Sequence, residues 1–257
     1  MHTSTTARSA DGTLIAFDRV GDGPPLILVE PAAHYRGFSA FDGLVPLLAA
    51  KLTVYTYDRR GRGESTDTPP YAPEREVEDL AALIAEAGGS ASVYGFSSGA
   101  LLGMHAAASG LPIAKLALLE PPLRDSDEPD PLTGQLAELV AARRDADAVE
   151  RFHEAIGVPG EMIAEMRATD AWRKMESVAP TLVYDCLLSE ATSARVLRAV
   201  EVETLVLDSS GSTDDLTGWA ASVAAQLPNA SHRSLEGEWH GVADEVLAPV
   251  LAGFLRS

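Results

Sequence analysis

Short apolar runs alternate with helical patterns along most of the chain, and this alternation constrains the fold more than any other feature. The runs are Thr13–Asp18, Leu26–Glu30, Thr53–Asp58, Ser92–Phe96, Lys115–Glu120, Thr204–Asp208 and Ser231–Leu235. Most of them are nearly continuous, as expected of strands covered on both faces. Amphipathic segments such as Glu74–Ala87 and Val242–Leu255 supply the helices. The sequence therefore predicts an α/β fold with a mostly parallel sheet flanked by helices.

One long segment interrupts this alternation. From about Leu123 to Val200 the sequence shows only helical patterns, which are Gln135–Arg144, Ala146–Ile156, Gly160–Thr169 and Leu182–Leu188. The acidic, proline-containing stretch Asp125–Pro131 at its start is typical of a linker. We therefore expect a core made of residues 1–122 and 201–257, with a helical lid formed by residues 123–200.

Composition narrows the class of protein. A chain of 257 residues with 46% hydrophobic and 23% charged residues is typical of one globular domain with an inserted subdomain. Its net charge of −18 disfavours binding to nucleic acids or to anionic membranes, because like charges repel. Cys186 is the only cysteine, which excludes an intrachain disulfide and a cysteine-rich metal cluster.

The start of the sequence does not resemble a targeting segment. The first residues, MHTSTTARSADG, lack the apolar region of a signal peptide. No stretch approaches the roughly 18 apolar residues that span a bilayer. We expect a cytoplasmic protein, and the sequence leaves open whether it is a monomer or a homodimer.

The most informative motif is Gly95-Phe96-Ser97-Ser98-Gly99, which follows an apolar run and precedes the helical pattern Ala100–Ala108. G-x-S-x-G between a strand and a helix is a nucleophile elbow, in which a tight turn exposes the serine hydroxyl at a helix N-terminus. The alternative is a purely structural turn. We predict that Ser97 is a nucleophile.

A serine nucleophile needs a base, and His240 is the histidine best placed to act as one. It is one of six histidines and lies in the loop between the run Ser231–Leu235 and the last helical segment. A histidine in this position can receive the serine proton. The alternative is an ordinary surface histidine.

With these motifs the chain resembles the α/β-hydrolases with a serine nucleophile, over nearly its whole length. The loop Asp58–Ser65 matches the family pattern D-x-R-G-x-G-x-S, and the elbow, the late histidine and the helical insertion after the sixth strand follow in the family order. The resemblance implies an oxyanion hole formed by the backbone N–H of Ser98 and a second N–H after the third strand. Relatives usually carry His-Gly there, whereas this chain has Glu30-Pro31-Ala32-Ala33. Because Pro31 has no N–H, we assign the second donor to Ala32 or a neighbour.

The acid that orients the histidine has two candidates. Most relatives carry an aspartate after the seventh strand, but an ungapped count places Ser212 there, and Asp214 follows shortly after it. Some lactone hydrolases and dehalogenases instead use a glutamate at the end of the sixth strand, which matches Glu120. A buried carboxylate at the end of an apolar strand is costly unless it is paired. We favour Glu120 and keep Asp214 as the alternative, while the role of Glu30 stays open between a paired buried acid and a specificity residue.

These residues predict a serine hydrolase that cleaves an ester, lactone or related carbonyl compound through an acyl-enzyme. The apolar lid favours a small hydrophobic substrate, and the mechanism requires no metal and no organic cofactor. The alternative is a non-hydrolytic member of the same fold, a ligand receptor or a biosynthetic catalyst. The departures at Glu30–Ala33 and at Ser212 are the features that favour this alternative.

Overall fold

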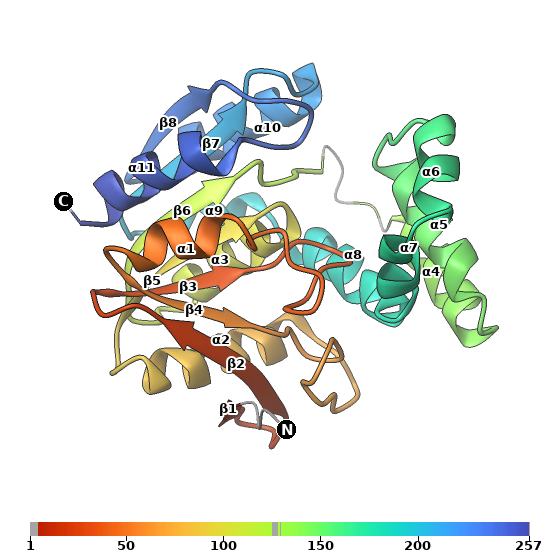
Figure 1. The fold of residues 1–257 in the computed structure, drawn as a ribbon, viewed down its shortest axis with the longest axis horizontal. Helices are drawn as coiled ribbons and strands as arrows, with labels where there is room; N and C mark the ends of the chain where they lie inside the picture. Colours follow the sequence, from red (N-terminus) through yellow and green to blue (C-terminus); the bar gives the residue numbers. More distant parts are fainter. Residues whose placement is uncertain (1–4, 125–127, 129, 257) are drawn as a thin grey trace.

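The computed structural model describes residues 5–124, 128 and 130–256, which form an eight-stranded sheet (Figure 1). The strand order is β1-β2-β4-β3-β5-β6-β7-β8. The strands are β1 (Thr5–Arg8), β2 (Leu14–Val20), β3 (Pro25–Val29), β4 (Thr53–Tyr57), β5 (Ala91–Phe96), β6 (Ile113–Leu119), β7 (Thr204–Ser209) and β8 (Ala230–Leu235). Only the β1–β2 and β2–β4 pairs are antiparallel. The carboxyl ends of β3 to β8 therefore lie along one edge of the sheet, where α/β proteins place their sites.

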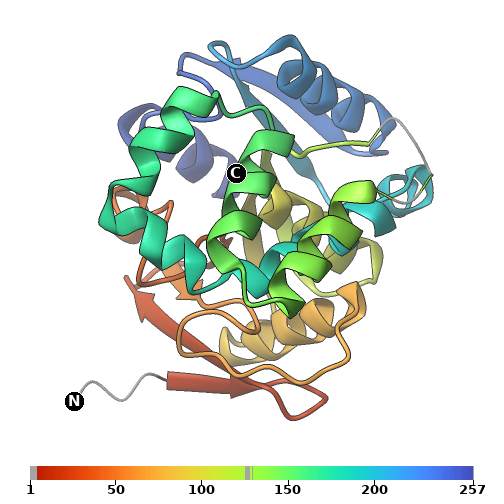
Figure 2. The same ribbon diagram turned by 90° about the vertical axis from the view of Figure 1, so that its right-hand side faces the viewer.

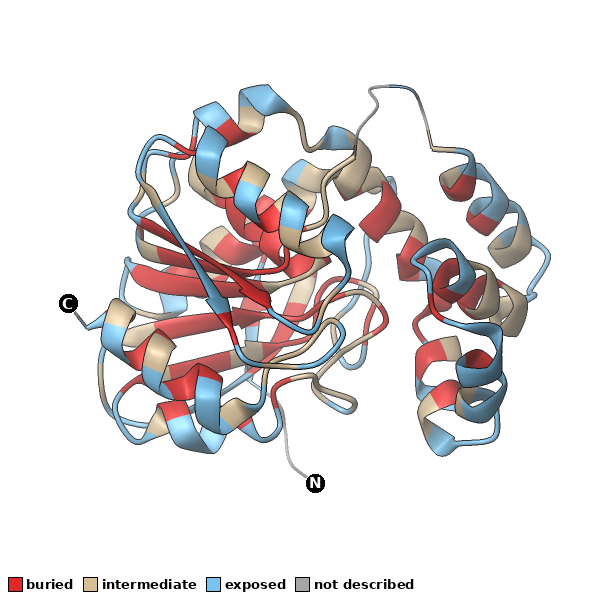
Figure 3. Cartoon of the chain, turned by 90° about the horizontal axis from the view of Figure 1, so that it is seen from above, coloured by how far each residue is buried: buried red, intermediate tan, exposed pale blue. Residues whose placement is uncertain are grey.

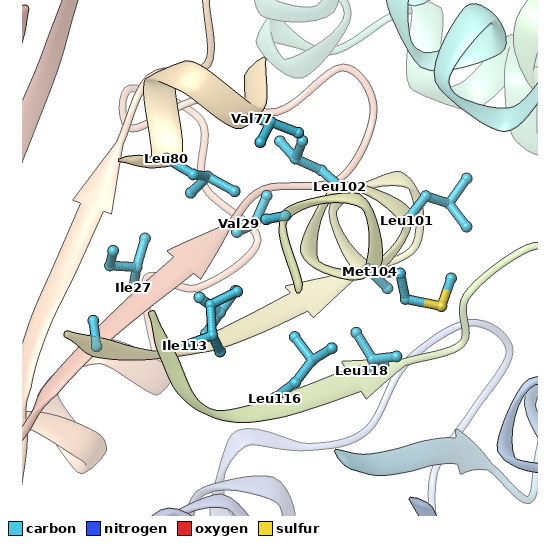
Figure 4. Packing of buried hydrophobic residues seen from close by; sticks show 14 of the residues in the cluster. Ile27, Val29, Val77, Leu80, Leu101, Leu102, Met104, Ile113, Leu116 and Leu118 are labelled. Carbon is cyan, nitrogen blue, oxygen red and sulfur yellow. The ribbon is translucent and has the colours of Figure 1, made fainter. Parts of the chain in front are cut away.

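Helices cover both faces of the sheet. Helices α1 (Leu44–Ala49) and α11 (Asp244–Leu255) pack on one face, and α2 (Pro73–Glu86), α3 (Ser98–Ala108) and α10 (Asp214–Gln226) pack on the other. An apolar cluster fills each face of the sheet, the first under α1 and α11 and the second under α2, α3 and α10. Successive strand residues point to opposite faces, so Leu26 and Leu28 belong to the first cluster and Ile27 and Val29 to the second. Figure 4 shows the second cluster closely packed, and Figure 3 shows the buried sheet between helices with exposed outer faces. Burial on both faces explains why these strands are continuously apolar.

The segment between β6 and β7 is helical. It contains α4 (Pro131–Ala141), α5 (Asp145–Ala155), α6 (Gly160–Arg167), α7 (Asp170–Glu176), a 3₁₀ turn η1 (Ala179–Thr181), α8 (Leu182–Ala191) and α9 (Ala194–Arg198). Phe152, Trp172 and Leu182 belong to an apolar cluster of its own, which also contacts Ala33 and Phe38 in the loop after β3. The insertion stands beside the main body in Figure 1 and faces the viewer in Figure 2. It thus packs on the loop that carries Ala32.

Several elements differ from the sequence-based expectation. The edge strand β1 and helices α1, α7, α9 and α10 have no counterpart among the predicted segments. All of these except α10 are too short to show a periodic pattern. The strand predicted to end at Glu120 ends at Leu119, since Glu120 adopts a positive φ of 45°. The predicted linker Asp125–Pro131 largely falls outside the described residues. Asp130 lies inside them and caps α4 by accepting a hydrogen bond from the Leu132 N–H.

None of the helices in the described part of the chain is long and apolar enough to cross a membrane.

Candidate active site

The predicted nucleophile lies at a sharp turn between β5 and α3. Ser97 has φ 53° and ψ −121°, a conformation that costs a non-glycine residue about 1–3 kcal/mol. The glycines of the motif permit this turn. A Cβ atom at Gly95 would lie 2.3 Å from the Gly99 carbonyl oxygen, and one at Gly99 would lie 2.2 Å from the Val29 carbonyl oxygen. The start of α3 thus lies so close to β5 and to β3 that glycine is required at both positions, as in a nucleophile elbow.

The predicted base lies in the loop between β8 and α11. His240 has a positive φ of 51°, and its Nδ1 lies 2.6 Å from Oε2 of Glu120. Its ring also contacts the rings of Phe96, 4.8 Å away between centroids, and Trp239, 5.6 Å away. An ionised Glu120 can only accept a hydrogen bond, so Nδ1 carries the proton and Nε2 keeps its lone pair. This is the tautomer that can accept a proton from a serine.

Glu120 is completely buried, and each of its carboxylate oxygens has a partner. Oε1 accepts hydrogen bonds from the Ser209 N–H at 2.8 Å and from the Ser212 hydroxyl at 2.6 Å, while Oε2 faces His240. The Ser212 oxygen in turn accepts from the His240 backbone N–H at 2.9 Å. The carboxylate therefore sits in one fixed orientation against the imidazole.

The alternative acid lies elsewhere. Asp214 is exposed at the first position of α10, and its side chain makes no hydrogen bond or ion pair with any residue that the structure describes. Ser212, which sequence reasoning set aside because it carries no charge, instead contacts both Glu120 and His240. The signal that could have found it was its position after the seventh strand, where the family resemblance implies an aspartate in most relatives.

The two predicted oxyanion donors lie on adjoining segments. Ser98 begins α3, and a Cβ at Gly99 would also come within 2.8 Å of the Glu30 carbonyl oxygen, so the loop with Ala32 lies directly against the elbow. The Ala32 carbonyl accepts a hydrogen bond from Nδ1 of His34 at 2.8 Å, which fixes the peptide that follows Ala32. Burial lowers the pKa of His34, so this ring is neutral at pH 7.

Glu30, the residue that replaces histidine in the family pattern, is 1% exposed. Its carboxyl accepts hydrogen bonds from the Ser39 hydroxyl and, at 3.1 Å, from the Ala40 N–H. Burial nevertheless raises its pKa from 4.5 to about 7. Of the two interpretations left open by the sequence, the contacts correspond to a paired buried acid.

Two other features bear on what the protein could bind. Within the described ranges, no group of three or more His, Cys, Asp or Glu side chains is placed to hold a metal ion. A surface groove between α4 and α5 is lined by Gln135, Glu138, Leu139, Ala142, Arg144 and Arg151, and contains none of the predicted site residues. The predicted catalytic residues Ser97, Glu120 and His240 instead follow β5, β6 and β8 at the carboxyl edge of the sheet.

Comparison with known proteins identifies the family. The profile described as the alpha/beta hydrolase family matches residues 26–246, which is most of the chain. The protein belongs to the alpha/beta hydrolase family. The fold class and the resemblance predicted from the sequence are both confirmed.

A solved alpha/beta hydrolase matches nearly the whole chain, and two other relatives match parts of it. The crystal structure of an alpha/beta hydrolase from Sphaerobacter thermophilus is 44% identical, with a TM-score of 0.90, and the match covers 97% of this chain and 99% of that one. A pimeloyl-(acyl-carrier protein) methyl ester esterase of Xanthomonas campestris is 35% identical over 118 residues, 44% of this chain and 44% of the esterase. The probable oxidoreductase EphD of Mycobacterium bovis is 38% identical over 85 residues, 30% of this chain. The match spans only 14% of the length of EphD, and less than half of that of the esterase.

Proposed function

We propose that this hydrolase cleaves a carboxylic ester, lactone or related carbonyl substrate through an acyl-enzyme on Ser97. The observation that carries the proposal is the 2.6 Å contact between His240 Nδ1 and Glu120, at the same sheet edge as the strained turn of Ser97. The partial match to a methyl ester esterase supports an ester substrate.

In the proposed reaction, Ser97 Oγ attacks the carbonyl carbon while Nε2 of His240 takes the hydroxyl proton. Glu120 stabilises the imidazolium that forms, and the N–H groups of Ser98 and Ala32 donate hydrogen bonds to the oxyanion. The tetrahedral intermediate then collapses, and the leaving alkoxide receives the proton from Nε2. Water attacks the acyl-enzyme by the same route, with His240 again as the base, and releases the carboxylic acid.

The surroundings of this site favour an apolar substrate. Ala32 and Phe38 pack against the apolar cluster of the insertion, and Trp239 remains 39% exposed beside His240. In this proposal residues 123–200 act as a lid over the site. Apolar walls would bind the hydrocarbon part of an ester and exclude water from the oxyanion.

A labelling experiment tests the proposal and separates it from a non-hydrolytic role. A fluorophosphonate probe should label the wild type and Ser210→Ala, an exposed control serine after β7, but not Ser97→Ala. Ser97→Ala should also lose at least about 10³ in kcat on p-nitrophenyl esters, as expected when a nucleophile is removed. Equal labelling of wild type and Ser97→Ala, or no hydrolysis of esters and lactones by the wild type, would contradict the acyl-enzyme and favour a receptor or biosynthetic catalyst.

A further inference from the structure

A cluster of buried charges connects helix α8 of the insertion to the nucleophile elbow. Asp185, on α8, is 3% exposed. Its Oδ1 accepts hydrogen bonds from the Ser98 hydroxyl at 2.8 Å and from Arg59 Nη1 at 2.7 Å. Its Oδ2 accepts a hydrogen bond from Arg62 Nη2 at 2.7 Å. One carboxylate of the insertion thus holds the residue that would supply the first oxyanion donor.

The same carboxylate reaches the loop with the second donor through Arg62. Nη1 of this arginine donates hydrogen bonds to the carbonyl oxygens of Pro31, at 2.7 Å, and His34, at 3.0 Å. These two carbonyls flank Ala32, whose N–H belongs to the peptide that carries the Pro31 carbonyl. The position of that N–H therefore depends on where the Arg62 guanidinium lies. Asp185 holds this group as its ionic partner, and the Thr181 hydroxyl accepts a hydrogen bond from its Nε at 3.0 Å.

Asp185 is the ionic partner that Arg62 depends on. Arg59 also pairs with Glu76, at 2.7 Å, whereas in the described part of the chain Asp185 is the only carboxylate paired with Arg62. Burial opposes ionisation of Asp185, but the charges of Arg62 and Arg59 outweigh it, and the pKa of Asp185 lies below its ordinary value. Asp185 therefore carries a full negative charge at neutral pH, and its loss would leave Arg62 buried without a counter-charge.

We propose that Asp185 is a positioning residue for the oxyanion hole. Its carboxylate holds Ser98 directly and the Pro31–His34 loop through Arg62, and so sets the separation of the two N–H donors. The hole is complete only when α8 is docked against α2 and α3. This proposal rests on the proposed function and adds to it a residue of the insertion that does not touch the substrate.

A neighbouring ion pair supplies the control. Arg60 pairs with Asp79 at 2.7 Å, and both residues are 1% exposed, as buried as the pair of Arg62 and Asp185. The other partners of Arg60 are Asp11 and the Arg75 carbonyl, which belong to neither side of the oxyanion hole. Asp79→Asn therefore removes a comparable buried charge without touching the two donors.

The test compares Asp185→Asn with Asp79→Asn. Asparagine would turn an NH₂ group toward one of the arginine or serine donors, so one of these contacts is lost. We expect kcat on a p-nitrophenyl ester to fall about 100-fold in Asp185→Asn, as when an oxyanion donor is lost, with KM changed less than about threefold. The affinity for a trifluoromethyl ketone, which forms a tetrahedral adduct, should fall in parallel. Asp79→Asn, which leaves Arg60 paired with Asp11, should lower Tm but keep kcat within about threefold.

Equal effects of the two variants on kcat and on adduct affinity would overturn the proposal, because a structural role alone would produce them. If Asp185→Asn does not fold, Ser98→Ala replaces it. This change removes the hydroxyl that donates to Asp185 and accepts from Arg59 Nη1 at 3.2 Å, and it keeps the Ser98 N–H. We expect it to lower kcat about fivefold at constant KM, and an unchanged kcat would overturn the proposal. Loss of activity in Ser97→Ala shows in either case whether the proposed function itself holds.

Discussion

Replacing Glu120 by glutamine tests the proposed acid, and the hydrogen bonds around it determine which way the new amide must face. The Ser209 N–H can only donate, so it requires the oxygen of the glutamine where Oε1 now lies. The NH₂ group then faces His240 Nδ1, which must accept instead of donate. The imidazole proton consequently moves to Nε2, the atom that has to receive the proton of Ser97.

The size of the effect follows from this exchange of tautomers. An aspartate-to-asparagine change in a serine protease triad preserves the geometry but lowers kcat by roughly 10⁴. We expect Glu120→Gln to lower kcat by about 10³–10⁴, which corresponds to about 4–5.5 kcal/mol in the activation free energy. Asp214→Asn should change kcat less than about tenfold, because Asp214 is exposed and has no side-chain contact with His240 in the described structure.

The assay is steady-state hydrolysis of a p-nitrophenyl ester by both variants, together with the rate of fluorophosphonate labelling. Thermal unfolding of each variant checks that the fold is retained. The reverse order of effects, with Asp214→Asn the more damaging, would assign the acid to the loop after β7 and refute the tautomer argument.

Two further outcomes follow from the same region. Ser212→Ala should lower kcat about tenfold with little change in KM, because both Glu120 and the His240 backbone lose a hydrogen bond, and kcat within twofold of wild type would contradict this. For Glu30, a native pKa of about 7 lies above the ordinary 4.5, so the native state holds a proton that the unfolded chain releases. Its contribution to stability is complete below pH 4.5 and is lost as the pH rises to about 7, by up to about 3 kcal/mol. Urea unfolding of Glu30→Gln should therefore show a weaker decline between pH 5 and pH 8 than the wild type, and equal slopes would contradict the shift.

The α/β sheet and the turn at Ser97 can be predicted from the sequence because short stretches of neighbouring residues determine them. Continuous apolar runs reflect burial on both faces of the sheet, and glycine at positions 95 and 99 reflects contacts that no other residue permits. Glu120 is favoured over Asp214 in the sequence because it ends an apolar strand, where a carboxylate is costly unless it is paired. The structure places Glu120 beside His240 and leaves Asp214 exposed.

The buried charge cluster could not be predicted in this way. Arg59 and Arg62 stand in a loop that resembles a family pattern, but their partner Asp185 lies more than 120 residues further along the chain. In the sequence Asp185 is simply one acid in a helical segment of the insertion. Ser212 was missed for a related reason, since its importance comes from two hydrogen bonds and not from a charge.

Helix α8 also limits how a substrate could enter. It shares in two apolar clusters, because Leu188 packs into the core of the sheet while Leu182 and Cys186 pack with α4 to α7. Lifting α8 would separate the buried Arg62–Asp185 pair, at a cost of about 3–5 kcal/mol. Among the residues that the structure describes, α4 to α7 form no buried ion pair with the core. Opening would thus involve α4 to α7 pivoting on α8, and their amides should exchange with solvent before those of α8. Replacing residues 131–178 by the corresponding segment of a relative could then change which substrates enter, while Ser97, His240 and Glu120 keep their positions.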